Sequence, residues 1–126
     1  MKKVMCSILI VFGLIITSFG QAEKVPGPAF KEVLSLRSVG SPVISPCGKH
    51  ILFTIRQPDW ENNRYDTEIW LSRSGVEPFQ LTQTAGDSSV SPSWSPDGKR
   101  IAFIANRDKT RQIYLINPLG GEAFKL

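Results

Sequence analysis

The sequence predicts an all-β fold of two consecutive four-stranded β-propeller blades, an incomplete propeller preceded by a signal peptide and a short helix. Three observations support this prediction. A Ser-Pro-Asp-Gly-Lys turn at 95–99 leads into a short apolar strand, a near copy of both begins at residue 45, and the strand after each copy also recurs. The repeat is about 44 to 50 residues long, which is typical of propeller blades.

The turn at 95–99 has a suitable residue at each position. Ser95 suits the first corner of a type I turn, Pro96 fixes φ at the second, and Gly98 tolerates a left-handed backbone. The residues that follow, 101–105, carry no polar side chain. We therefore expect both faces of this strand to be covered, as in a small sheet packed between two neighbouring sheets.

The match between the repeats continues beyond the turn. Ile-Trp-Leu at 69–71 corresponds to Ile-Tyr-Leu at 113–115. Glu-Pro-Phe-Gln-Leu at 77–81 corresponds to Glu-Ala-Phe-Lys-Leu at 122–126. The two repeats therefore share a turn, two inner strands and a short outer strand.

These matches define two blades, the first at 41–82 and the second, truncated, at 83–126. Strands are expected near 42–44, 51–56, 67–72, 79–81, 91–94, 101–106, 112–117 and from 123 onward. Two aromatic pairs should occupy equivalent buried positions: Phe53 with Phe103, and Trp70 with Tyr114. Because each blade buries its faces only against its neighbours, the sequence resembles the front of a longer protein.

Residues 1–20 have the features of a signal peptide. A basic Met-Lys-Lys start precedes an apolar run at 4–16 and a small-residue end. We expect cleavage between Gly20 and Gln21, which would make the protein exported, periplasmic or secreted, with no stable membrane anchor. An uncleaved membrane anchor is the alternative, but the apolar run is shorter than the roughly 20 residues that span a bilayer.

Residues 21–40 are predicted to form an extended arm and a short helix. Four residues before the Gly-Ser-Pro stop have helical spacing: Phe30, Val33, Leu34 and Arg37. A helix of about two turns is expected, and its apolar stripe must pack against another part of the fold.

Composition excludes several classes of function. Cleavage would lower the formal net charge from +4 to +2, because the leader holds two lysines and no acidic residue, and no basic run remains to bind nucleic acid. Cys47 would be the only cysteine left, and we interpret it as a small turn residue in the place of Asp97. His50, the only histidine, takes the place of Arg100 and is expected to be solvated. No metal site or cofactor site is predicted.

The polar segment 57–66 carries the candidate contact residues Trp60, Arg64 and Tyr65. One interpretation is an exposed hairpin tip with its aromatic rings folded over the base. The other is a loop that contacts a partner domain or a substrate, since aromatic and arginine side chains are common at interfaces. No catalytic residue is assigned in this chain.

The doubled Ser-Pro-x-Gly-Lys turn, the Phe-containing strand, Ile-Trp-Leu or Ile-Tyr-Leu, and Gly-Gly-Glu resemble blades of TolB-type propellers and of the prolyl oligopeptidase family. The order of the segments along the chain indicates one group within these families. A leader and a helix ending at 36–40 precede an Asp-Trp-Glu-Asn-Asn-Arg-Tyr loop at 59–65 and Asp-Ser-Ser at 87–89. Over about residues 30–126 this order is similar to the N-terminus of bacterial acylaminoacyl-peptidase or dipeptidyl-peptidase-like members.

The resemblance implies a serine peptidase whose propeller gates or scaffolds the access of short peptides to a C-terminal α/β-hydrolase domain with a Ser, Asp and His triad. These residues contain no Gly-x-Ser-x-Gly motif, and His50 is the only histidine. The expected partners are that hydrolase domain and short peptide substrates. Cys47 departs from the family's turn, which usually has Asp at this position.

Two alternatives stay open. One is a periplasmic TolB-like propeller that binds other proteins without catalysis, because a fold alone does not decide function. The presence of a hydrolase domain beyond Leu126 would favour the peptidase hypothesis, and its absence would favour the binding protein. The other is a complete small exported protein that oligomerises to complete its propeller.

Overall fold

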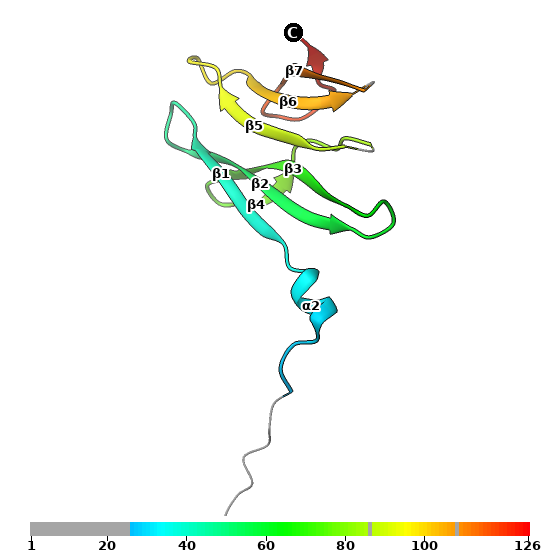
Figure 1. Ribbon diagram of the computed structural model, residues 1–126. Helices are drawn as coiled ribbons and strands as arrows, with labels where there is room; N and C mark the ends of the chain where they lie inside the picture. Colours follow the sequence, from blue (N-terminus) through cyan, green and yellow to red (C-terminus); the bar gives the residue numbers. More distant parts are fainter. Residues whose placement is uncertain (1–25, 86, 108) are drawn as a thin grey trace, which may run out of the picture.

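The computed structural model describes residues 26–85, 87–107 and 109–126, which form two four-stranded antiparallel sheets (Figure 1). The first sheet has the order β1 (Ser38–Ile44), β2 (His50–Asp59), β3 (Arg64–Arg73) and β4 (Val76–Gln80). The second has the order β5 (Ser89–Trp94), β6 (Ile101–Arg107), β7 (Thr110–Ile116) and β8 (Phe124–Lys125). The prediction of two consecutive four-stranded blades is confirmed.

A short helix, α2 (Phe30–Leu34), precedes the first sheet. It has five residues rather than two turns, and its Phe30 side chain is 79% exposed. Val33 is also exposed and only Leu34 is half-buried, so most of the expected apolar stripe is not packed against the described residues. The predicted signal peptide and its cleavage site lie outside the described residues.

Backbone pairing extends several strands beyond their predicted limits, as β1, β2 and β3 show. β1 begins at Ser38 rather than Pro42, because its first residues pair with 54–56 of β2. β2 and β3 stay paired as far as Asp59 and Arg64, so most of the predicted loop between them is strand. Continuous strand pairing satisfies the backbone N–H and C=O groups whatever the side chains are, so a polar sequence pattern does not reveal it.

The two Ser-Pro-x-Gly turns have the same geometry. In each, the glycine N–H donates to the serine carbonyl at 2.9 Å. The glycine φ is 71° at Gly48 and 67° at Gly98. The Ser95 hydroxyl donates to the Asp97 carboxylate at 2.6 Å, and the Cys47 thiol lies 3.3 Å from the serine hydroxyl of the first turn. The exposed cysteine therefore occupies the turn position of the aspartate.

The main core lies between the two sheets. Residues paired across neighbouring strands share a face, and the first sheet points Leu52, Ile69 and Leu71 toward the second. The face of the second sheet that packs against them is also buried. It consists of Ile101, Phe103, Ala105, Tyr114 and Ile116. Figure 1 shows β5 lying next to the first sheet, where it contacts β1, β2 and β3. Truncating one of these large side chains to alanine would cost about 2–5 kcal/mol.

The sheets pack front to back. Phe53 pairs with Trp70, and Phe103 pairs with Tyr114, so the two aromatic pairs have equivalent positions. Phe103 and Tyr114 point into the core, whereas Phe53 and Trp70 are half-buried on the opposite face of the first sheet. The expectation of equal burial is therefore wrong, because the same face of the blade meets a neighbour only in the second sheet.

A buried carboxylate holds the segment that joins β4 to β5. Glu68 is 4% exposed, and its carboxylate accepts hydrogen bonds from the Thr82 hydroxyl and the Thr84 N–H, both at 2.5 Å. The Ile69 N–H donates to the Thr82 hydroxyl at 2.9 Å, and the hydroxyls of Thr84 and Ser89 lie 2.7 Å apart. Burial raises the pKa of Glu68, while these hydrogen bonds act in the opposite direction.

A second link between the sheets involves His50. This residue is half-buried, with its ring centre 6.3 Å from the Trp94 ring. The Trp94 indole N–H donates to the Val43 carbonyl at 3.3 Å. The expected solvated role of His50 is therefore wrong, because an aromatic ring of the second sheet covers it.

Gly98→Val is expected to destabilise the fold more than Lys99→Val. A Cβ at Gly98 would lie 3.9 Å from the Pro46 ring, an ordinary contact, so the cost comes from the left-handed φ. We expect about 1–2 kcal/mol for Gly98→Val and about 0.5 kcal/mol or less for exposed Lys99. Urea unfolding followed by tryptophan fluorescence measures both, and equal losses would contradict this turn geometry.

Glu68→Gln should flatten the pH dependence of stability. Since burial raises the folded-state pKa of Glu68, its favourable contribution is fully present below the unfolded pKa of about 4.3 and is lost as pH rises through the higher folded pKa. The test compares urea midpoints from mildly acidic to neutral pH. Exposed Glu77→Gln is the matched control, and an unchanged slope in the Glu68 variant would refute the assignment.

Candidate interaction site at the β2–β3 hairpin

The tip of the β2–β3 hairpin is organised by Asp59. Pairing ends at Asp59 and Arg64, which leaves 60–63 as the tip. The Asp59 carboxylate accepts hydrogen bonds from the Asn62 N–H at 3.2 Å, the Asn62 side-chain amide at 2.8 Å and the Arg64 Nε at 3.1 Å. Asn63 takes the left-handed conformation, with φ of 48°. Asparagine is among the residues that tolerate this backbone best.

These contacts fix the charge state of the tip. The side-chain amide of Asn62 is the main cause that lowers the pKa of Asp59, with its backbone N–H and the Arg64 guanidinium acting in the same direction. Arg64 therefore faces an ionised carboxylate. Its guanidinium stabilises the turn, and its role as a contact residue stays a prediction.

Two aromatic side chains flank this turn. Trp60 is 54% exposed and Tyr65 is 45% exposed. The Arg56 guanidinium carbon lies 3.7 Å from the centre of the Tyr65 ring, which is a cation–π contact. A small pocket of about 190 Å³ lies at this hairpin, and its lining includes Trp60, Arg64, Tyr65 and Leu34 from α2.

The structure thus brings the three candidate residues Trp60, Arg64 and Tyr65 to one pocket. Sequence reasoning missed Asp59, which lines the pocket, and Arg56, which contacts the Tyr65 ring. The Asp-x-x-Asn spacing was a usable signal for Asp59, since aspartate side chains bond to the backbone in turns. Nothing in the sequence indicated Arg56, which reaches Tyr65 only because β2 and β3 are paired there.

The hairpin site presents exposed side chains for contact. In the described ranges, no three His, Cys, Asp or Glu side chains gather as ligands for a metal ion. None of the helices in the described part of the chain has the length and hydrophobicity to cross a bilayer. The hairpin offers exposed ring faces beside a neutralised ion pair.

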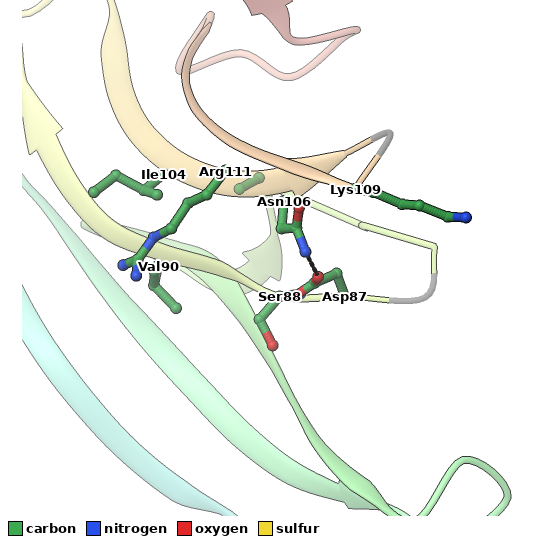
Figure 2. A pocket seen from close by; sticks show the side chains of 8 residues that line it. Asp87, Ser88, Val90, Ile104, Asn106, Lys109 and Arg111 are labelled. Carbon is green, nitrogen blue, oxygen red and sulfur yellow. Dashed lines mark hydrogen bonds between the residues drawn. The ribbon is translucent and has the colours of Figure 1, made fainter.

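A second depression, of about 500 Å³, lies on the outer face of the second sheet. Val90 and Ile104 form part of its floor. Figure 2 shows the Asn106 amide pointing to Asp87, a hydrogen bond of 2.5 Å, while Arg111 lies over the apolar residues. This depression belongs to a sheet face rather than to a closed cavity.

Comparison with known proteins relates the chain to peptidases. It is 33% identical over 100 residues to the uncharacterized peptidase YuxL of Bacillus subtilis, covering 75% of this chain and 15% of that protein. It is 27% identical over 88 residues to dipeptidyl-peptidase 5 of Porphyromonas endodontalis, covering 70% of this chain and 13% of that protein. No family model matches the chain.

Two further similarities concern the blades. The chain is 32% identical over 65 residues to the Tol-Pal system protein TolB of Acinetobacter baylyi, covering 52% of this chain and 15% of that protein. A variant of AtxE2 isopeptidase, solved with Astexin3-dC4 bound, superposes with a TM-score of 0.64 at 15% identity. That superposition covers 80% of this chain and 20% of the isopeptidase, and it supports the fold alone.

The chain spans no more than 15% of the length of these curated relatives. Its similarity to peptidases covers most of the described residues, and its two sheets have the blade motifs that TolB shares. The chain therefore resembles part of a peptidase-family propeller and has TolB-like blades.

Proposed function

We propose that this chain is a propeller segment of an exported serine peptidase, where it gates or scaffolds the access of short peptides to a C-terminal α/β-hydrolase domain. The observation that carries the proposal is the 33% identity to a peptidase over 75% of the chain. The implied partners are the hydrolase domain and short peptides. The leader at 1–20 supports export to the periplasm or the medium.

The hairpin supplies the means of contact. The ten-residue strands hold Tyr65 on paired backbone and place Trp60 in the turn directly after β2, so less backbone freedom is lost on binding than in a long loop. Exposed tryptophan and tyrosine supply large contact areas at interfaces. A peptide or a neighbouring domain with apolar side chains fits this surface better than a small charged ligand, because Asp59 already neutralises Arg64.

The second candidate function is a TolB-like binding module without catalysis. The observation that favours it is the 32% identity to TolB over 52% of the chain. Both functions use the same blades, so they differ in whether the complete gene product contains a nucleophilic serine.

The complete gene product is expected to react with a fluorophosphonate probe, which labels activated serines. The reading frame downstream of codon 126 should then encode further blades and a Gly-x-Ser-x-Gly motif. Heat-denatured product is the control for nonspecific labelling. A product that closes its propeller and stays unlabelled would replace the peptidase proposal with the binding module.

Trp60→Ala in the complete gene product is expected to lower kcat/KM for short peptide amides by roughly tenfold, equivalent to about 1.4 kcal/mol, through loss of an exposed contact. Stability should change by about 0.5 kcal/mol or less, since the ring is at a surface tip. Leu119→Ala, an exposed apolar residue in the β7–β8 turn, is the matched control. Equal kinetics for the two variants would remove Trp60 from the contact surface.

A further inference from the structure

A pocket of about 450 Å³ lies at the junction of the two sheets, at the end that carries the Ser-Pro-x-Gly turns. Both sheets line it. His50 and Arg73 pair with each other at the start of β2 and the end of β3, and Trp94 ends β5. Figure 1 shows the two turns on the side opposite the β2–β3 hairpin, so this pocket is separate from the hairpin site. Its volume is typical of sites for small molecules, which measure about 300–1,000 Å³.

The charged groups of this pocket are all basic. Arg73 and Lys99 line it, and no aspartate or glutamate does so among the described residues. The Arg73 guanidinium donates to the Pro118 carbonyl, and its central carbon lies 5.1 Å from the centre of the Phe79 ring. Neutral groups therefore hold it in place. No ion pair of the described residues involves Arg73 or Lys99, so both positive charges lack a carboxylate partner there.

One buried nitrogen of the lining also lacks a partner. His50 Nδ1 makes no hydrogen bond within the described part of the chain. Buried polar atoms are nearly always hydrogen-bonded to protein or to ordered water. The imidazole is therefore a further group that a polar ligand in this pocket can engage.

The remaining large side chains of the lining are apolar. The Trp94 indole N–H already donates to the Val43 carbonyl at 3.3 Å, so the ring offers its carbon surface to the pocket. Pro118 and Leu119 continue this surface, and Leu119 is 78% exposed. A matching ligand carries a negative charge next to an apolar group. Guanidinium and ammonium groups bind carboxylates through short, charge-assisted hydrogen bonds.

We propose that this pocket binds a carboxylate attached to an apolar group, with Arg73 and Lys99 on the carboxylate and Trp94 against the apolar group. A small organic acid presents this chemistry, and so does the C-terminus of a short peptide with an apolar last residue. The inference goes beyond the proposed function and does not depend on it, because the lining residues that carry it belong to the two described sheets.

Lysine footprinting of the complete gene product tests the site directly. The probes are N-acetylphenylalanine, which represents a peptide C-terminus, phenylpropionate, which represents an organic acid, and the uncharged N-acetylphenylalanine amide. At a concentration about ten times its Kd, a bound acid should slow the acetylation of Lys99 about tenfold by mass action, as measured by mass spectrometry. Lys49 is the internal control, because it has the same place in the first turn but does not line the pocket.

Lys99→Met should weaken the binding of N-acetylphenylalanine at least about tenfold in isothermal titration calorimetry, the loss expected for one charge-assisted hydrogen bond. Lys49→Met is the matched control and should bind like the wild type. Both lysines are exposed turn residues, so both variants should fold. The footprint on the wild-type product needs no variant and tests the site independently of folding.

Protection of Lys99 by either acid upholds the proposal, and the acid that protects identifies the source of the carboxylate. Four results would overturn it: no protection by either acid, equal protection of Lys49 and Lys99, equal protection by the amide, and unchanged affinity in Lys99→Met. Fluorophosphonate labelling reports on the peptidase proposal alone, so either proposal can fail while the other stands. The peptide amides of the Trp60 test lack a free carboxylate, so Leu119→Ala remains a valid control there.

Discussion

The packing of the first sheet on the second is the interaction on which the rest of this structure depends. Leu52 and Leu71 on one side and Phe103 and Tyr114 on the other share one buried cluster. A blade with two apolar faces can bury only one of them against a single neighbour, so the described residues leave Phe53 and Ile113 on outer faces. The same apolar character that holds the two sheets together therefore also leaves an apolar surface on each outer face.

Polar contacts at both edges fix how the sheets sit on each other. At one edge, the buried carboxylate of Glu68 receives the Thr82 hydroxyl and the Thr84 N–H, so the linker adopts a single path. At another, the Trp94 indole reaches the Val43 carbonyl and its ring lies beside His50. Apolar packing is non-directional, so these directional hydrogen bonds determine the register that packing alone would leave open.

The candidate contact site follows from this rigidity. Long pairing of β2 with β3 carries Trp60 away from the core, and Asp59 holds the turn so that Trp60 and Tyr65 stay exposed. The side chains of the β2–β3 hairpin are suited to hold another molecule in position. A contact role of this kind is part of the peptidase proposal, which rests on the similarity to a peptidase.

The sequence by itself determined the elements that local chemistry and repetition dictate. The two turns, with Gly48 and Gly98 at positive φ, follow from steric rules, and the equivalence of Phe53 with Phe103 and of Trp70 with Tyr114 follows from the repeat. The sequence also indicated Trp60, Arg64 and Tyr65 as contact residues. It did not indicate that Arg64 forms an ion pair with Asp59.

Only the tertiary structure decided which of the two apolar faces of each sheet is buried. Side chains alternate between the two faces along each strand, and both sets are apolar. The tertiary structure also decided the contact of His50 with Trp94 and the role of Glu68, since these depend on where one sheet lies against another. Contacts between residues far apart in sequence leave no local pattern to read.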